Sequence, residues 1–365
     1  MTQISLAATA GWKLEEPPLR SHAVSAWLLA IATIVLAMVV VGGATRLTGS
    51  GLSITEWKPV SGAIPPLGDA DWARAFALYK QSAQYRLINS GISLDQFRTL
   101  FWWEWAHRLL ARVLAVVFAL PAVVFVVTRR LPRRLWGRCV GLFLLGGLQG
   151  LAGWWMVKSG LEGRAAVLPE RLATHLALAL LLLGALVWTA LDAWAGPAPT
   201  RSSVVQDEGR TWVRDGMLLV AAIFLQCLMG ALVAGNHAGL IDGDWPMMAG
   251  RVVPEGYWRG GLWTTLAHGP EATQFDHRLL AYAVFAGALL LAWRAARLQS
   301  GRPLRLLAGA LAACVSLQLV LGVATLWLQV PLALALLHQV NAALLLSLSV
   351  AFLWRARRGI PLPQA

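Results

Sequence analysis

The stretch that decides the fold is residues 306–354, LLAGALAACVSLQLVLGVATLWLQVPLALALLHQVNAALLLSLSVAFLW. It contains no Asp, Glu, Lys or Arg. A helix needs about 20 apolar residues to cross the hydrocarbon core of a bilayer, and this stretch is more than twice that length. We therefore predict two membrane helices, separated by a tight turn at Gln329-Val330-Pro331, where proline disfavours a continuous helix.

Similar uncharged runs recur along the chain. Of its 365 residues, 58% are hydrophobic and 13% charged, and the mean hydropathy is +0.61, whereas soluble domains carry about 25% charged residues. We predict an all-α integral membrane protein with eight transmembrane helices. Their expected bounds are 25–45, 101–128, 139–157, 172–191, 216–236, 273–293, 306–329 and 332–354. The first run exceeds the roughly 7 to 15 residues of a signal-peptide core, so we interpret it as the first membrane helix.

Basic residues are distributed unequally between alternate loops. One side, formed by the N-terminus, residues 129–138, 192–215 and 294–305 and the C-terminal tail, holds 2, 5, 3, 4 and 3 Lys and Arg against 6 acidic residues. The other side, formed by residues 44–100, 158–171 and 235–271, holds 11 basic and 10 acidic residues. The positive-inside rule predicts a cell inner membrane protein with both termini in the cytoplasm. Topology thus accounts for the net charge of +13, and nucleic acid is not an expected partner because no basic groove with stacking aromatics is evident.

An internal repeat links the two halves of the sequence. His107-Arg108-Leu109-Leu110-Ala111 on the second predicted helix recurs as His277-Arg278-Leu279-Leu280-Ala281 on the sixth. Leu148-Gln149 with Gly153 on the third helix recurs as Leu317-Gln318 with Gly322 on the seventh, and His175 on the fourth corresponds to His338 on the eighth. Four helices per half would give both copies the same orientation, a parallel repeat.

We therefore predict two tandem four-helix bundles related by duplication. The N-terminal half comprises residues 1–193, a cytoplasmic linker spans 194–212, and the C-terminal half comprises 213–365. The three cysteines, Cys139, Cys227 and Cys314, each fall inside an apolar run, so we expect buried thiols without a disulfide or a C-x-x-C role.

The four repeated histidines are the candidate ligands. His107, His175, His277 and His338 all lie near the outer ends of even-numbered helices, two in each half. A helical bundle grips a cofactor with side chains from facing helices, and two imidazoles can occupy both axial positions of a haem iron. A single intramembrane histidine can equally be a packing residue, but repetition favours ligation. A zinc or copper site would usually recruit further ligands.

Other residues could complete a haem site. Gly146, Gly147, Gly150 and Gly153 could give a porphyrin room, although small residues also let bare helices pack closely. Arg108 and Arg278 could bind haem propionates, with snorkelling to the interface as the alternative.

Glu104 distinguishes the halves, because it lies three residues before His107, where Gln274 precedes His277. A buried carboxylate can be tuned for proton transfer, which favours a reaction site in the first half. The alternative is an ion pair between Glu104 and Arg108.

Four segments give this chain a family resemblance. GGATRLTGSGLS at 42–53, EWKPVSGAIPPL at 56–67, EWAHR at 104–108 and QFDHR at 274–278 resemble the haem A synthase family, and the resemblance spans nearly the whole chain. Some family members carry a cysteine pair in the first outer loop, whereas residues 44–100 here contain none. The chain therefore resembles the mitochondrial and proteobacterial branch, and a mechanism that depends on that pair is excluded.

The resemblance implies an enzyme that oxidises the C8 methyl group of haem O to a formyl group, giving haem A for terminal oxidases. It implies haem O and haem A bound by His107 and His175 in the N-terminal half, with Glu104 catalytic, and haem b bound by His277 and His338 in the C-terminal half. Two successive hydroxylations and loss of water would be the simplest route. The implied partners are haem O, a haem O synthase, an electron donor or acceptor and the lipid bilayer, and a homo-oligomer is left open.

Two other functions fit the same histidines. A membrane cytochrome b with bis-histidine haems would carry electrons without modifying any haem. A transporter built from parallel repeats would use histidines to relay protons and would be colourless. The Glu104 asymmetry and the loop segments favour the enzyme, and an absorption spectrum followed by pigment chromatography separates all three.

Overall fold

The computed structural model describes residues 20–197, 206–298 and 300–358. It contains eight helices long and apolar enough to cross a membrane, which confirms the predicted number and order. They are α1 His22–Leu47, α4 Leu94–Val127, α5 Trp136–Leu161, α6 Pro169–Ala195, α7 Gln206–Gly235, α8 Pro270–Arg297, α9 Arg302–Trp327 and α10 Leu332–Arg357. The predicted turn between the last two is also confirmed, and Gln329 and Val330 reverse the chain there with positive φ angles of 59° and 57°.

Two helices begin well before their predicted starts. α4 starts at Leu94 instead of residue 101 because Ser93 and Gln96 form a capping box, which satisfies free N–H groups at the helix start. α7 starts at Gln206 instead of residue 216, and it passes through Asp215, which is paired with Arg294 of α8. Hydropathy locates the apolar part of a helix and misses the polar turns beyond it. The linker expected at 194–212 therefore shortens to 196–205, of which 198–205 lie outside the described residues.

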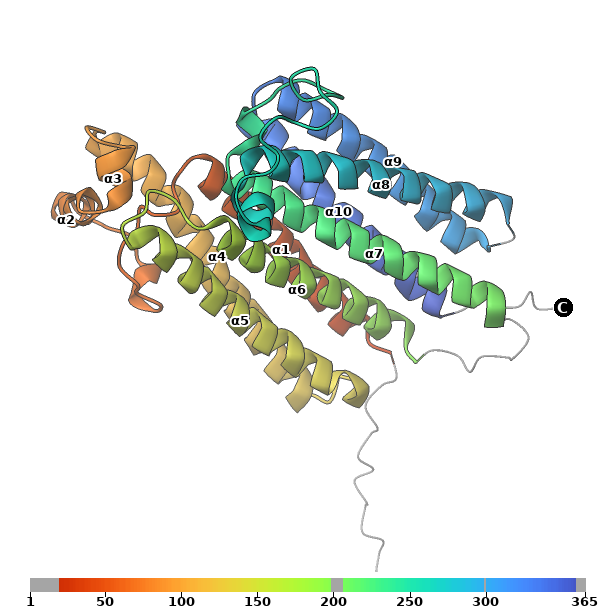
Figure 1. Cartoon of the computed structure of the whole chain (residues 1–365). Coiled ribbons are helices and arrows are strands. Elements are labelled where there is room, and N and C mark those ends of the chain that lie inside the picture. The colour runs from red at the N-terminus through yellow and green to blue at the C-terminus, as the bar shows by residue number, and fades with distance from the viewer. Residues whose placement is uncertain (1–19, 198–205, 299, 359–365) are drawn as a thin grey trace, which may run out of the picture.

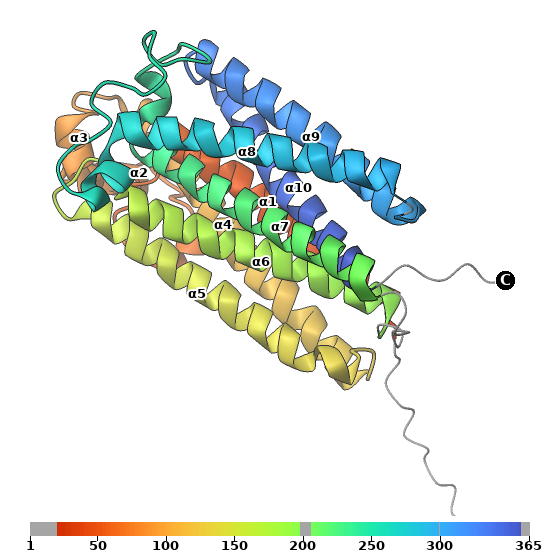
Figure 2. The same cartoon turned by 45° about the vertical axis from the view of Figure 1, so that its right-hand side comes forward.

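The eight helices form two rings of four helices each, which we call the N-terminal ring and the C-terminal ring. α1, α4, α5 and α6 contact one another in a closed circuit, and α7, α8, α9 and α10 do the same. α1 and α6 pack against α7 and α10 to join the rings, so that α5 and α9 lie on opposite sides of the molecule in both views (Figures 1 and 2). The main hydrophobic core runs through both rings. This arrangement is compatible with duplication, which stays a prediction.

One end of the bundle carries a small helical cap. It contains α2 Asp69–Lys80, which packs on α4, and α3 Ala83–Leu87, which contacts α2 and α5 (Figure 1). The cap has its own aromatic core of Trp72, Tyr79, Phe97 and Phe101. The outer loop predicted at 44–100 is therefore a folded unit, and it supports α4 beyond the apolar part of the helix. We call this end the cap end.

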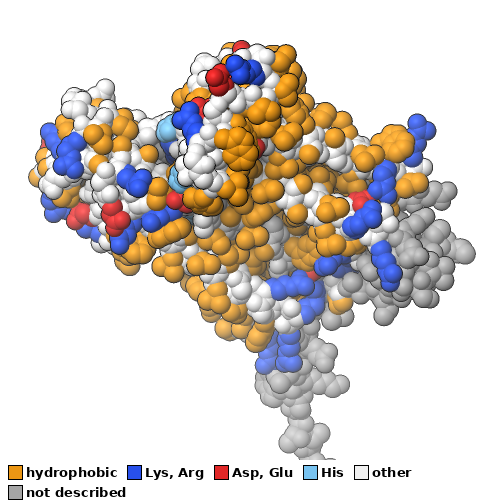
Figure 3. Space-filling model, in the orientation of Figure 1, with side chains coloured by type: hydrophobic (Ala, Val, Ile, Leu, Met, Phe, Trp, Pro, Cys, Tyr) orange, Lys and Arg blue, Asp and Glu red, His pale blue; other side chains and the backbone are white. Residues whose placement is uncertain are grey.

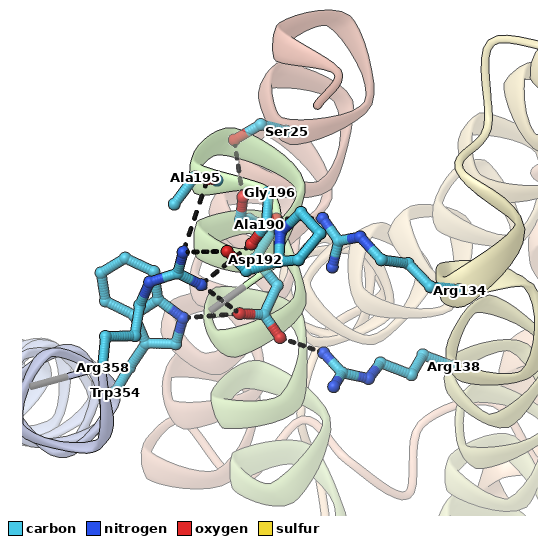
Figure 4. A network of polar contacts seen from close by, with 10 residues as sticks. Ser25, Arg134, Arg138, Ala190, Asp192, Ala195, Gly196, Trp354 and Arg358 are labelled. Atoms are coloured by element: carbon cyan, nitrogen blue, oxygen red, sulfur yellow. Dashed lines mark hydrogen bonds and ion pairs between the residues drawn. The ribbon is translucent and has the colours of Figure 1, made fainter. Parts of the chain in front are cut away.

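The opposite end, the arginine end, is held by Asp192 near the end of α6 (Figure 4). Its carboxylate accepts hydrogen bonds from Arg138 of α5, from Trp354 Nε1 of α10 at 2.8 Å and from Arg358 at 3.5 Å. Arg134 donates to the Asp192 backbone carbonyl at 2.6 Å. One carboxylate therefore links α5, α6 and α10, and so connects the two rings.

The surface agrees with a membrane setting. Hydrophobic side chains cover the middle of the visible face, while Lys, Arg, Asp and Glu gather toward the cap end and the arginine end (Figure 3). Valines and leucines that point outward from α4 are more than half exposed, among them Val116 at 53% and Leu120 at 64%. Such a band of exposed apolar residues is what contact with lipid requires. The chain is a multi-pass membrane protein.

Candidate haem sites

The four repeated histidines share one local environment. Each lies on an even-numbered span, within the turns nearest the cap end, and its imidazole lies against a glycine of the preceding span. A Cβ built on that glycine would lie about 3 Å from the imidazole Cε1 atom in every case. The pairs and distances are His107 with Gly42 at 2.9 Å, His175 with Gly153 at 2.9 Å, His277 with Gly230 at 3.1 Å and His338 with Gly322 at 2.9 Å.

These glycines form a cradle for each ring. Contacts of about 3 Å with a Cβ are closer than ordinary van der Waals packing, so alanine would push the ring from its place. Of the four glycines predicted to make room for a porphyrin, only Gly153 touches a histidine; a Cβ on Gly146, Gly147 or Gly150 would meet nothing within 4 Å. Those three glycines contact no histidine, and their room for a porphyrin stays a prediction.

The two imidazoles of the C-terminal ring lie at a spacing that suits a haem. The imidazole centroids of His277 and His338 are 6.4 Å apart, and the two imidazole planes lie at 74° to each other. An imidazole nitrogen binds a metal at about 2 Å, so two rings on opposite faces of one iron would have centres roughly 6 Å apart. The Nδ1 atoms of His107, His175 and His277 are buried with no hydrogen-bond partner among the described residues. The unpartnered imidazole nitrogens in both rings, together with the spacing of the C-terminal pair, fit bound haem.

Glutamines accompany three of the histidines. Gln149 Nε2 lies 3.4 Å from His175 Nε2, and Gln226 Nε2 donates to the His277 backbone carbonyl at 2.9 Å. Gln318 Nε2 lies 3.2 Å from both ring nitrogens of His338. Each glutamine stands four residues before the cradle glycine of the same helix, and residues four apart share a helix face.

Glu104 is buried beside the N-terminal site, only 3% exposed. One carboxylate oxygen, Oε2, accepts hydrogen bonds from Ser53 Oγ and from the Ile54 N–H, both at 2.8 Å. The other, Oε1, accepts from Arg108 Nη2 at 2.7 Å, while Arg108 also donates to the Ile54 carbonyl at 2.9 Å. The expected alternative, an ion pair between Glu104 and Arg108, is present, and the pair clamps the first outer loop onto α4.

The C-terminal half repeats this clamp without a carboxylate. Gln274 Nε2 donates to the Asp242 carbonyl at 2.9 Å, and Arg278 Nη2 donates to the same oxygen at 3.1 Å. Arg278 Nη1 adds hydrogen bonds to the carbonyls of Asp244 and Met247. Both arginines predicted to reach haem propionates therefore bind loop carbonyls in this structure, next to the histidines.

The remaining histidines lie away from the two candidate haem sites. Arg46 Nη2 lies 2.9 Å from His237 Nε2 and donates to the Ala234 carbonyl, joining α1 to the end of α7. His268 Nε2 lies 3.7 Å from Glu170, and His22 packs edge-on against Trp194. The three cysteines are free thiols; Cys139 is buried, as predicted, whereas Cys227 and Cys314 are half-buried.

Sequence reasoning missed three cradle residues. Gln149 with Gly153 and Gln318 with Gly322 are visible as a repeat, but Gln226 with Gly230 has the same spacing and completes the set. Gly42 was also missed as a partner of His107, although it lies within a segment that carries the family resemblance. The spacing of four between glutamine and glycine, on the third, fifth and seventh spans, could have found Gln226 and Gly230, whereas Gly42 has no glutamine four residues before it.

Comparison with known proteins identifies the family of this chain. The family model described as "Cytochrome oxidase assembly protein" matches residues 25–350. Two relatives named heme A synthase, from Caulobacter sp. (strain K31) and Caulobacter vibrioides, are each 52% identical over 93% of this chain and 97% of their own length. A third, from Maricaulis maris, is 46% identical over 93% of this chain and 98% of its own. The chain belongs to the family of cytochrome oxidase assembly proteins.

Proposed function

We propose that this chain is a haem A synthase, which oxidises the C8 methyl group of haem O to a formyl group. The observation that carries the proposal is the set of four histidines, two in each ring and each cradled by a glycine, with a buried carboxylate beside the N-terminal pair only. The relatives that bear this name cover nearly the whole chain at about half identity, and residues in all the quoted family segments lie at the cap end.

The net chemistry sets what the protein must provide. Converting a methyl group and one water to a formyl group releases four protons and four electrons, so the site needs both a proton path and an electron acceptor. When bound, the resident haem b in the C-terminal ring would supply one-electron transfer. His277 and His338 would hold it, and the chain's own residues would bind and orient the substrate haem in the N-terminal ring.

In the N-terminal ring, His107 and His175 would hold haem O as substrate. The Gly42 and Gly153 cradles fix the positions of these two imidazoles. Glu104 and Arg108, which flank His107 in the sequence, hold the Ser53-Ile54 segment against α4. Among the described residues, Glu104 is the buried carboxylate at this site that could accept a proton once Arg108 or Ser53 moves.

The orientation and partners follow from the same proposal. The cap end would face outward and the arginine end the cytoplasm, because the short loops rich in arginine lie at the latter. Both termini, which lie outside the described residues, would then be cytoplasmic. A haem O synthase and an electron donor or acceptor would be the partners of the reaction, in the inner membrane.

Pigment analysis of the purified full-length protein tests the proposal. In nanodiscs supplied with haem O and with air, whose oxygen can accept the four electrons, the parent protein should yield haem A on extraction and chromatography, and His107→Ala should not. A plain cytochrome b would return haem O unchanged while keeping haem b. A colourless preparation would refute haem binding altogether and favour the transporter.

A further inference from the structure

The glutamine partners of the histidines are incomplete, and the gap falls in the N-terminal ring. A shift of 188 residues relates Gly42 of α1 to Gly230 of α7 as cradle residues, and the same shift relates Met38 to Gln226. Met38 therefore occupies the position of the missing glutamine. A thioether cannot donate a hydrogen bond, so α1 offers His107 no counterpart of the contact that Gln226 makes.

The other three histidines are restrained to different degrees. Gln318 contacts both ring nitrogens of His338, donates to its carbonyl at 3.1 Å, and is itself held by Asn341 Nδ2, which donates to Gln318 Oε1 at 2.7 Å. Asn341 also donates to the Cys314 carbonyl. His338 is thus held by two connected layers of amides.

The N-terminal ring lacks the second layer. Asn341 lies three residues after His338, and the residue three after His175 is Leu178, whose side chain has no hydrogen-bonding group. The Oε1 atoms of Gln149 and Gln226 are both buried without a hydrogen-bond partner among the described residues, so the second layer supports Gln318 alone. The restraint is therefore strongest at His338, weaker at His175 and His277, and lowest at His107.

We infer that Gln149, Gln226 and Gln318 are positioning residues for three haem-binding histidines, and that Met38 leaves His107 weakly restrained so that the N-terminal ring exchanges haem. This inference rests on the proposed function. A substrate site must release its product after each conversion, whereas a resident electron carrier must stay bound. Partners that fix a coordinated imidazole typically change metal affinity by about 10-fold to 100-fold, enough to separate an exchanging site from a retaining one.

The structure supplies a reciprocal pair of variants. Met38→Gln installs the missing amide in the N-terminal ring, and Gln226→Met removes its counterpart from the C-terminal ring. Met38→Leu is the matched control, because it keeps an apolar side chain of similar volume without a donor.

Haem release from the purified full-length protein is the measurement. Holoprotein in nanodiscs is mixed with excess apomyoglobin, the transfer is followed by absorbance, and the pigment that leaves is identified by chromatography. We expect Met38→Gln to slow release of haem O and haem A about fivefold, the effect of roughly one hydrogen bond, with haem b retained. Gln226→Met should release haem b about fivefold faster and reduce the low-spin fraction of its spectrum, and Met38→Leu should match the parent.

Each variant tests one part of the inference by itself. Equal release rates in Met38→Gln and Met38→Leu would overturn the role of Met38, and parental haem b retention in Gln226→Met would overturn the role of the glutamines. Should Met38→Gln fold poorly, Gln226→Met still decides. The transfer rates are read without any turnover, so a parent protein that binds haem O and leaves it unconverted would refute the proposed function without deciding this inference.

Discussion

His277 and His338 face each other in the C-terminal ring with centroids 6.4 Å apart, although 61 residues separate them in the chain. If these two imidazoles hold the resident haem b, replacing either should remove it. We expect His277→Ala and His338→Ala to lose most haem b from the purified protein, measured by the reduced-minus-oxidised spectrum. His268→Ala, outside both rings, is the control and should keep it. Haem b content equal to the parent in either ring variant would refute the ligand assignment.

The cradle glycines should be as sensitive as the histidines. A Cβ at position 322 would lie 2.9 Å from His338 Cε1, whereas one at position 309 of the same helix would meet nothing within 4 Å. We therefore expect Gly322→Ala to displace the ring and lower haem b content at least fivefold, and Gly309→Ala to leave it unchanged. Because alanine also raises helix propensity equally at both sites, a similar loss in both variants would mean that helix packing, and not the cradle, decides haem content.

The orientation of the two ends can be tested by labelling. Ala77 on α2 is exposed at the cap end, and Arg133 is exposed at the arginine end. With a membrane-impermeant maleimide applied to spheroplasts, Ala77→Cys should react at once and Arg133→Cys only after lysis. The parent, whose three cysteines lie within membrane helices, measures the background. The reverse pattern would place both termini outside and contradict the predicted topology.

Much of this fold follows from hydropathy, because a bilayer admits few backbone arrangements. Leu306–Trp354 could be divided at Pro331 from sequence because no single helix of that length is needed to cross a bilayer. The early start of α4 could not be predicted in this way. It depends on the cap, whose core joins Trp72 and Tyr79 to Phe97 through long-range contacts that local sequence does not specify.

In the candidate haem sites, too, some features could be predicted from the sequence and others depend on the fold. Repetition identified the four histidines, since a costly polar residue rarely recurs at one depth without a function. Their environment depends on which helices become neighbours, so Gly42 and Gly230 could not be assigned to His107 and His277 before the rings were known. The partners of Arg108 and Arg278 lie in outer loops, and only the folded loop reveals that carbonyl oxygens reach them.

The contact between Arg46 and His237 predicts a pH dependence of stability. Burial, and secondarily the Arg46 charge, lower the pKa of His237 below its ordinary value of 6.5. The unfolded chain therefore binds more protons near pH 6, and this contribution to stability is present above pH 6.5 and lost as the pH falls through the folded-state pKa. We expect the thermal midpoint to fall between pH 7.5 and 5.5, and to fall less in His237→Gln, which keeps an acceptor and does not titrate. An identical pH profile in the variant would exclude His237 as a cause.

Glu104 is charged, whereas Gln274 at the corresponding position of the C-terminal half is neutral. Replacing Glu104 tests whether this charge serves the reaction. Glu104→Gln keeps the shape, but an amide nitrogen must then face a donor, either Arg108 or the Ser53-Ile54 pair, so one contact is lost along with the charge. The C-terminal ring uses other residues, so haem b should remain bound. We expect conversion of haem O to haem A to fall about a hundredfold, the lower range for loss of a positioned acid or base.

Ser53→Ala removes one of the three donors and keeps the charge, so it should lower conversion much less than Glu104→Gln if the charge matters. It should lower conversion equally if only the loop clamp matters. Haem A formation at the parental rate in Glu104→Gln would reduce Glu104 to a partner of Arg108, and loss of haem b would make it a structural residue for the whole bundle.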